Sequence, residues 1–334
     1  MVATRWTPAV HWFGEQAPDS DLVIRCPFPA HLNKHFDQLV VDTERWFLEQ
    51  DIFSGYEDAD RLTRQFLNFQ GAEEHARMWP DADYPGLWLA GRLLTHMSCL
   101  DDFLDEIWGP DQDEHAAHVV GLITDILTGK ANPAEVAAEP LAVLLDSLWT
   151  ETRAVAPDHW LDRAARIHLA YLETSMAERT HRAASSVPTT AQYVTSRHYN
   201  GGMFYAAALI ELANEAWLPE DVSSRPEISD LALRLSNAST WANDLFSYER
   251  EAAHGAGDNL AVVLTTHEDL TEQEAVTKIV ELVNAELLTL DFLCDAAAAL
   301  PDPAPRYAKG VRALASGLMY WMATTARYGS TPNA

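Results

Sequence analysis

The sequence predicts an all-α fold built as one large domain. Helix signals dominate the chain, whereas the alternation of apolar and polar residues that is typical of strands is nearly absent. The expected helices are joined by short turns containing Pro, Gly or Asp, and no internal repeat or low-complexity linker divides them. With 334 residues and 48% hydrophobic content, the chain can bury a sizeable core.

The chain is expected to begin with an extended strap and to continue as a helical domain. The strap covers residues 1–30, which contain Pro27 and Pro29, and the helical domain covers 31–330. Most helices of this domain are predicted, in chain order, at 35–50, 60–78, 84–108, 114–129, 134–156, 158–184, 226–254 and 306–328.

Two further helices have recognisable ends. Thr271 and Glu274 form a capping box before an apolar-periodic run to about residue 300, where a Pro-Asp-Pro sequence stops the helix. Another helix begins after Pro188 and is interrupted by the glycine pair 201–202. Because glycine inside a helix costs about 1 kcal/mol relative to alanine, this break needs a reason. A carbonyl freed there can point into a cavity; a plain kink or a close helix crossing is the alternative.

The composition limits the partners and the compartment. A formal net charge of -27 argues against nucleic acid or an anionic membrane as a partner. The three cysteines Cys26, Cys99 and Cys294 are far apart, so neither a disulfide framework nor a zinc site is indicated. Without a signal-like N-terminus or a run of about 18 apolar residues, the chain is expected to be soluble and cytoplasmic.

The first candidate site is the acidic segment 101–106, with the sequence DDFLDE. On a helix of about 3.6 residues per turn, Asp101 and Asp105 share one face. Hard carboxylate oxygens of this kind suit magnesium, which water and substrate phosphate then complete. Taken alone, however, an acidic helix face is more often a solvated surface.

A second segment, about 140 residues later, changes that balance. Asn243, Ser247 and Glu251 follow each other at spacings of four, which again places oxygen donors on one helix face. The neighbouring Trp241 and Phe246 are apolar, which is unusual for a solvated face. Two such arrays facing each other would grip a magnesium–diphosphate cluster, and this requirement also favours one domain.

At these motifs the chain resembles the class I terpene synthases, specifically the single-domain bacterial terpene cyclases. The family's DDxxD motif matches Asp101, Asp102 and Asp105. Its NDxxSxxxE triad matches Asn243, Asp244, Ser247 and Glu251. The resemblance spans nearly the whole chain and implies a helical bundle with a central active-site cavity. It also implies a metal set of three Mg²⁺ ions held by Asp101, Asp105, Asn243, Ser247 and Glu251.

The resemblance assigns roles to further residues. The family's diphosphate-sensing arginine lies 46 residues before the triad's Asn, which corresponds to Arg197. The linker and effector positions that follow it are Asn200 and Gly201. The basic residue before the triad's Glu, the Arg-Tyr pair near the C-terminus and an aromatic wall position correspond to Arg250, Arg327 with Tyr328, and Trp321. Arg197, Arg250 and Arg327 would offset the negative charge of the protein at the pocket mouth.

Two departures from the family pattern bear on substrate and mechanism. Many relatives carry Asp where this chain has Asn200, which puts the bracing of the arginine sensor in doubt. Relatives often carry bulky aromatics before the first motif, whereas this chain has Met97, Ser98 and Cys99. Met97 is therefore expected at the substrate, and the smaller wall favours a geranylgeranyl chain, whereas the family as a whole favours farnesyl.

The resemblance implies a Mg²⁺-dependent terpene cyclase that ionises farnesyl or geranylgeranyl diphosphate, cyclises the carbocation and releases diphosphate. A prenyl diphosphate synthase is the enzymatic alternative, but it should carry a second DDxxD rather than NDLFSYERE. An acidic helical metal-binding or interaction protein is the non-enzymatic alternative, and it leaves the positions of the arginines unexplained. A homodimer remains open.

Overall fold

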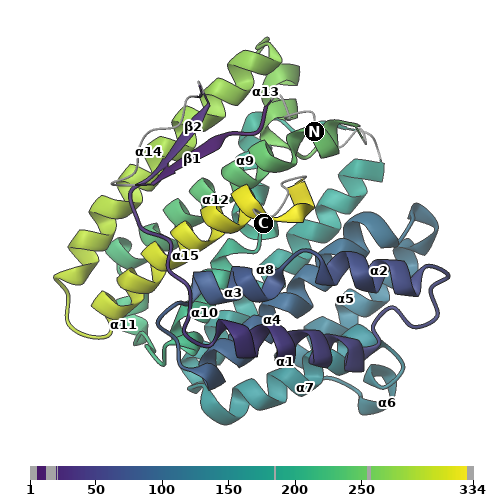
Figure 1. Cartoon of the computed structure of the whole chain (residues 1–334). Coiled ribbons are helices and arrows are strands. Elements are labelled where there is room, and N and C mark those ends of the chain that lie inside the picture. Colours follow the sequence, from purple (N-terminus) through teal and green to yellow (C-terminus); the bar gives the residue numbers. More distant parts are fainter. Residues whose placement is uncertain (1–5, 13–19, 21, 184–185, 254–256, 329–334) are drawn as a thin grey trace.

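The computed structural model describes residues 6–12, 20, 22–183, 186–253 and 257–328. As predicted, the chain is overwhelmingly helical, and its long helices pack against one another (Figure 1). The helices that line the cavity described below are α2 (Ala59–Leu67), α3 (Gly71–Met78), α4 (Tyr84–Asp102), α8 (Asp158–Ala183), α9 (Thr190–Asn200), α10 (Met203–Ala213), α12 (Pro226–Ala253) and α15 (Ala304–Thr324). The outer helices are α1 (Phe36–Gln50), α5 (Asp113–Thr128), α6 (Pro133–Val136), α7 (Pro140–Val155), α11 (Glu220–Ser223), α13 (Leu260–His267) and α14 (Glu272–Ala298).

The N-terminal segment contains the described strands. β1 (Ala9–Trp12) and β2 (Val23–Cys26) pair in parallel and lie beside α14 (Figure 1). Asn284 on α14 holds this edge, because its side chain accepts from the Arg25 amide at 2.6 Å and donates to the Val23 carbonyl at 2.9 Å. The two strands of the expected strap are therefore extended, and the Asn284 side chain forms hydrogen bonds with two of their backbone groups.

Three predicted helices are each divided in the structure. The segment 306–328 forms α15, which ends at Thr324, and the short 3₁₀ turn Ala326–Tyr328, because Thr325 between them is extended. The segment 60–78 forms α2 and α3, separated by Gln70, whose φ of 60° is left-handed and cannot continue a helix. The segment 134–156 forms α6 and α7, and α7 begins at Pro140. Proline lacks an N–H and fits the first helical position, so this boundary was readable from the sequence. α13 was not predicted, because its eight residues are too few for a clear period.

The break at the glycine pair is confirmed. α9 ends at Asn200, and Gly202 has a φ of +69° before α10 begins at Met203. A left-handed residue interrupts the helical hydrogen bonds, and glycine adopts it without steric cost. Gly201 consequently lies at the cavity rather than inside a continuous helix.

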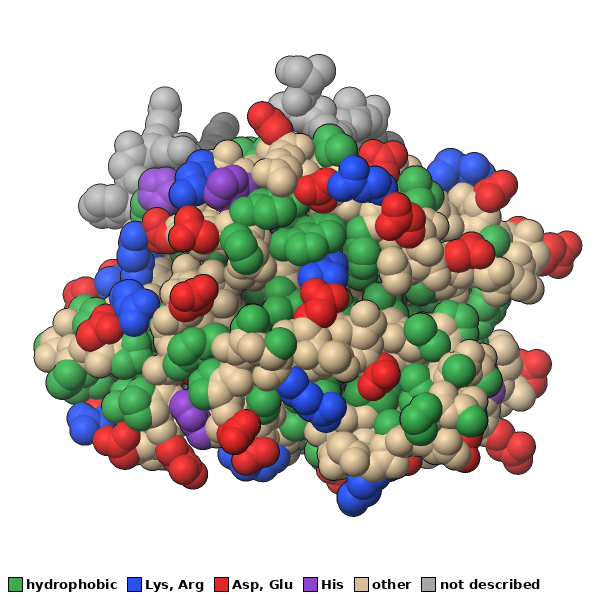
Figure 2. All heavy atoms as spheres, turned by 90° about the horizontal axis from the view of Figure 1, so that it is seen from below, with side chains coloured by type: hydrophobic (Ala, Val, Ile, Leu, Met, Phe, Trp, Pro, Cys, Tyr) green, Lys and Arg blue, Asp and Glu red, His purple; other side chains and the backbone are tan. Residues whose placement is uncertain are grey.

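The surface matches the acidic composition. Figure 2 shows Asp and Glu side chains spread over one face, with Lys and Arg dispersed between them rather than gathered into a patch. In the described part of the chain, no helix is both long and apolar enough to cross a membrane.

Candidate active site

One cavity of about 790 Å³ lies between the helices, a volume within the usual range for small-molecule sites. Charged and polar side chains gather at one part of its lining, and apolar side chains form much of the rest. The apolar lining consists of Phe66, Phe69, Met203, Leu318, Trp321 and Met322. The charged lining includes Asp101, Asp102, Asp105, Glu106, Glu178, Arg182, Arg197, Arg250, Glu251, Asp258 and Arg327.

The first acidic segment lies where α4 ends. Asp101, Asp102, Asp105 and Glu106 all line the cavity. Beyond Asp102 the backbone changes to a π-helical turn over Phe103–Ile107, closed by a 2.9 Å bond from the Trp108 amide to the Phe103 carbonyl. Such wider turns recur at functional sites. Adjacent residues of a regular α-helix do not share a face. In this wider turn, however, Asp105 and Glu106 both line the cavity.

Asp101 is the most deeply placed carboxylate of this segment. Its Oδ1 accepts a 2.9 Å hydrogen bond from the Tyr171 hydroxyl on α8. Burial, followed by the nearby carboxylates of Asp105 and Asp102, raises the pKa of Asp101 to about 7. The protein alone therefore does not compensate the negative charge gathered here, and a cation would.

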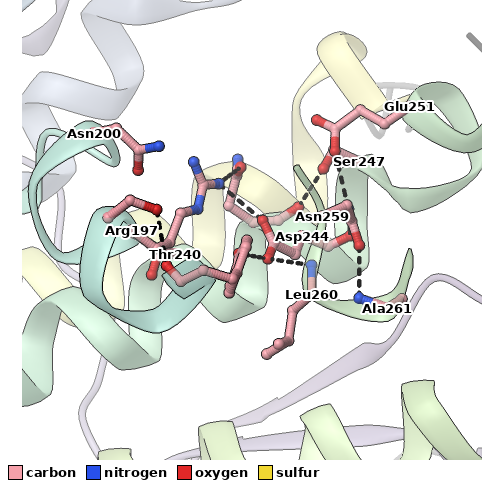
Figure 3. Close-up of polar contacts among 12 residues, drawn as sticks. Arg197, Asn200, Thr240, Asp244, Ser247, Glu251, Asn259, Leu260 and Ala261 are labelled. Carbon is pink, nitrogen blue, oxygen red and sulfur yellow. Dashed lines mark hydrogen bonds and ion pairs between the residues drawn. The ribbon is translucent and has the colours of Figure 1, made fainter. Parts of the chain in front are cut away.

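The second segment lies on α12 and divides its side chains between two directions. Asn243 and Glu251 line the cavity. Ser247, between them, is buried, and its Oγ donates to the Asn243 carbonyl at 2.8 Å. Asp244 points away from the cavity surface, where it accepts from the Tyr193 hydroxyl and, at 3.0 Å, from the Leu260 amide (Figure 3).

Arg197 joins α9 to this second segment. Its Nη2 lies 3.1 Å from Asn243 Oδ1 and 2.8 Å from Asp244 Oδ1 (Figure 3). The Asp244 side chain is fully buried and that of Arg197 is 17% exposed, so the ion pair is shielded from water. Asp244 on α12 therefore holds the Arg197 guanidinium in place at the cavity.

Asn200 does not brace Arg197. Its Nδ2 donates to Glu178 Oε2 on α8, and neither a dashed line in Figure 3 nor any hydrogen bond in the described structure joins it to Arg197. The same Glu178 accepts from Arg182 at 2.9 Å. In this chain, the position where many relatives carry Asp is therefore tied to α8, and the arginine is held by Asp244.

The C-terminal pair reaches both acidic segments from the short 3₁₀ turn Ala326–Tyr328. Arg327 Nη2 lies 3.0 Å from Asp102 Oδ1. The Tyr328 hydroxyl accepts from Asn243 Nδ2 at 2.6 Å. Arg250 also lines the cavity and lies 3.5 Å from Glu106 Oε1. Arg197, Arg250 and Arg327 thus all reach the charged part of the lining.

The two side chains predicted at the apolar wall differ in position. Trp321 lines the cavity, and its Nε1 donates to the Phe69 carbonyl at 2.8 Å, which fixes the ring. Met97 is buried outside the lining residues, and its Cε packs against Gly202, where an added Cβ would lie 2.6 Å away. Contact of either side chain with a substrate stays a prediction. At this level of α4 the lining residue is Ser98.

Sequence reasoning missed several residues of the charged lining. Arg182 on α8 lies 3.0 Å from Asp105 Oδ1 and 3.7 Å from Asp258 Oδ2. Since it also pairs with Glu178, it contacts three acidic residues. In the sequence, Glu178 and Arg182 are an ordinary helix pair four residues apart. Only the packing of α8 against the end of α4 distinguishes this pair from a surface pair.

The donor chemistry fits a hard divalent cation. The available ligands are carboxylate, amide and hydroxyl oxygens of Asp101, Asp105, Asn243, Ser247 and Glu251, and such donors suit magnesium. Among the residues that the structure describes, no three His, Cys, Asp or Glu side chains form a ready cage by themselves.

The sequence of this chain is similar to those of proteins with named activities. Pristinol synthase of Streptomyces pristinaespiralis is 28% identical over 92% of this chain and 85% of its own length. The (2E,6E)-farnesyl diphosphate-cyclising 4-epi-cubebol synthase of Streptosporangium roseum is 26% identical over 91% of this chain and 90% of its own.

Solved structures have the same fold. The linalool/nerolidol synthase of Streptomyces clavuligerus superposes with a TM-score of 0.78 at 25% identity, covering 90% of this chain and 99% of that one. The 2-methylisoborneol synthase of Streptomyces coelicolor A3(2), solved with Mg²⁺ and 2-fluoroneryl diphosphate, has a TM-score of 0.81 at 24% identity and covers 93% and 98%. The family model for terpene synthase family 2, C-terminal metal binding, matches residues 92–288. That match covers more than half of the chain and includes both acidic segments, so this protein belongs to terpene synthase family 2.

Proposed function

We propose that this terpene synthase is a magnesium-dependent cyclase that ionises farnesyl diphosphate, cyclises the resulting carbocation and releases diphosphate. The observation that carries the proposal is the convergence of two oxygen arrays, from the end of α4 and from α12, on the charged lining of one cavity. Because lining residues from α2 to Tyr328 meet there, the proposal also takes the chain as one catalytic domain.

The metal residues would be Asp101 and Asp105 on one side and Asn243, Ser247 and Glu251 on the other. Three Mg²⁺ ions, the number implied by the family resemblance, would when bound stabilise negative charge on the departing diphosphate. Ser247 would exchange its bond to the Asn243 carbonyl for the metal, which a hydroxyl does by simple rotation.

The arginines would hold the leaving group. Arg197 presents its guanidinium beside Asn243, and Arg250 and Arg327 enter the same lining from α12 and the C-terminal turn. Planar guanidinium groups bind phosphate oxygens with paired, charge-assisted hydrogen bonds. Arg327, which already lines the cavity, would exchange its 3.0 Å contact with Asp102 for the diphosphate.

The apolar wall would guide the carbocation. Phe66, Phe69 and Trp321 line the cavity, and aromatic faces attract a cation by about 2 kcal/mol when water is absent. A wall of this kind also excludes water from most of the cavity, which protects a reactive intermediate.

Farnesyl diphosphate is the preferred substrate in this proposal. The 4-epi-cubebol synthase relative carries farnesyl diphosphate in its name. The argument for a longer chain required Met97 and Cys99 to widen the wall, but Met97 packs on Gly202 and Cys99 is buried. Only Ser98 of that group lines the cavity.

The test is an incubation of the purified chain with geranyl, farnesyl and geranylgeranyl diphosphate in the presence of Mg²⁺. Diphosphate release and extracted products, read by gas chromatography with mass spectrometry, should both peak with the farnesyl substrate and vanish with a chelator. Release that persists without a divalent cation would contradict the metal role, and a geranylgeranyl preference would restore the reading from the sequence.

A further inference from the structure

Four polar side chains interrupt the apolar part of the cavity. His75 on α3, Thr95 and Ser98 on α4, and Ser239 on α12 all line it. In the described structure the side chains of His75, Thr95 and Ser98 make no hydrogen bond, and of the four groups only the Ser239 hydroxyl is fully buried without a partner. Because buried polar groups are almost always paired with protein or with ordered water, this lining calls for a ligand.

His75 is the deepest of these groups relative to the metal motifs. Its Nδ1 lies against Gly91, where an added Cβ would approach to 2.9 Å, so the missing side chain of Gly91 makes room for the ring. Gly91 precedes Asp101 by ten residues, or about 15 Å along an α-helix. The imidazole therefore packs on α4 almost three turns before the first acidic segment, a position here called the deep end of the cavity.

Thr95 lies close to that imidazole. Residues 91, 95 and 98 share one face of α4, with Thr95 one turn, about 6 Å, from the glycine that packs on His75. His75 is 3% exposed and Thr95 is 5% exposed, so bulk water does not reach them freely. A single water between an imidazole and a hydroxyl would have at least the two polar partners that a buried water requires.

We infer that His75 and Thr95 hold one water molecule at the deep end of the cavity, and that this water captures the cyclised carbocation to give a terpene alcohol. The inference rests on the proposed cyclase function and specifies how its reaction ends. Ser98 and Ser239 lie nearer the metal motifs, three residues before Asp101 and four before Asn243, and they have no part in this step.

The step balances with water as the only co-reactant. A lone pair of the water oxygen forms the new C–O bond to the cationic carbon, and the resulting oxonium gives one proton to an imidazole nitrogen of His75. The products are the neutral alcohol and an imidazolium. Burial lowers the pKa of His75 to about 4, so the ring is neutral and able to accept at neutral pH. An oxonium is a far stronger acid than such an imidazolium, so the transfer is downhill.

The experiment uses the full chain, Mg²⁺ and farnesyl diphosphate in oxygen-18 water. Two quantities are measured in each reaction, the diphosphate released and the ratio of alcohol to hydrocarbon among the products. The parent should give mainly a cyclic alcohol that carries the heavy oxygen. Thr95→Val, which keeps the shape but removes the hydroxyl, should lower the alcohol-to-hydrocarbon ratio at least tenfold, whereas Thr95→Ser should retain it.

His75→Phe should shift the products in the same direction, and Gly91→Ala should do so by displacing the ring. Hydrocarbon as the only parent product overturns the inference while leaving the cyclase function standing. An unchanged alcohol ratio in both Thr95→Val and His75→Phe overturns it as well. Absence of diphosphate release from any prenyl diphosphate by the folded parent would reject the cyclase function, and this inference falls with it.

Discussion

Arg197 and Asp244 form an ion pair at 2.8 Å in which the carboxylate side chain is completely buried. Asp244 therefore braces Arg197, which lines the cavity, and is not itself among the lining residues. The brace is itself fixed, because Tyr193 and the Leu260 amide donate to its other oxygen. Within the second motif, Asn243 and Glu251 thus line the cavity, whereas Asp244 stabilises Arg197 from outside the lining.

The first prediction concerns this brace. Asp244→Asn removes the charge but keeps the shape, so Arg197 stays buried without its counter-ion. Breaking a buried pair in this way costs about 3–5 kcal/mol, and the free energy of unfolding measured with urea should fall by that order. Tyr193→Phe is the matched control, because it removes a single hydrogen bond and should cost about 1 kcal/mol. Equal, small losses in both variants would show that Asp244 does not carry the pair.

The second prediction concerns the metal arrays. Asp101→Ala and Glu251→Ala each remove one proposed ligand from opposite sides of the cavity, so both should abolish release of diphosphate and terpene. The helical circular dichroism signal and the melting midpoint should stay nearly unchanged, because relief of repulsion among the carboxylates offsets lost contacts. Normal turnover by either variant at any magnesium concentration would refute the two-array arrangement.

Local patterns in the sequence predicted most of the helices and the positions of the two acidic segments on them. The spacing of Asn243, Ser247 and Glu251 and the capping box at Thr271 are local signals, and the helices that carry them are present. The division at Gln70 was not predictable, because a left-handed φ in a non-glycine residue has no strong sequence signature.

The unpredicted part of the site depends on long-range packing. Arg182 meets Asp105 across 77 residues of sequence, and Asn200 meets Glu178, which is not part of a recognised pattern. The place of Met97 before the first motif likewise did not indicate its packing partner. Its side chain packs on Gly202, and the direction of a side chain on a helix buried on several sides cannot be read from its sequence neighbours.

The third prediction is a pH dependence of stability that comes from a buried histidine. Burial, and secondarily His96, lower the pKa of His168 to about 3, and neither of its ring nitrogens has a partner in the described structure. The unfolded chain binds a proton at this residue below about pH 6.5, whereas the folded chain does not until about pH 3. The folded state therefore loses stability as the pH falls from 6.5, by about 1.4 kcal/mol per pH unit.

His168→Phe isolates this contribution. Phenylalanine keeps a ring beside Tyr205, whose ring centre lies 4.8 Å away, and it forfeits no hydrogen bond, so stability at pH 7.5 should be nearly that of the parent. Carboxyl groups with raised pKa values, such as Glu211 at about 7, change the slope in the opposite direction but equally in both proteins. Urea unfolding is measured between pH 7.5 and 4.5. Below pH 6.5 the free energy of unfolding of the variant should rise relative to that of the parent. If the two free energies change with pH in parallel, His168 is not the source of the pH dependence.

The fourth prediction concerns Arg197 as a diphosphate ligand. Losing one charge-assisted contact should cost about 1.5–3 kcal/mol of transition-state stabilisation, roughly a ten- to 150-fold lower rate. Arg197→Ala also leaves Asp244 buried and unpaired, so its lower activity would mix a folding defect with a catalytic one. Arg197→Lys separates the two effects, because lysine keeps the charge beside Asp244 but lacks the planar fork. It should fold with nearly parental stability and still turn over slowly.

Inorganic diphosphate as an added inhibitor completes this test in steady-state kinetics. If Arg197 binds the leaving group, catalysis and inhibition by diphosphate should weaken together in Arg197→Lys, since both use the same two-point contact. Arg250→Lys is the comparison, because Arg250 pairs at 3.5 Å with Glu106 and approaches the cavity from α12. If Arg197→Lys is stable, turns over substrate like the parent and remains fully inhibited by diphosphate, then Arg197 serves only to join α9 to α12 through Asp244.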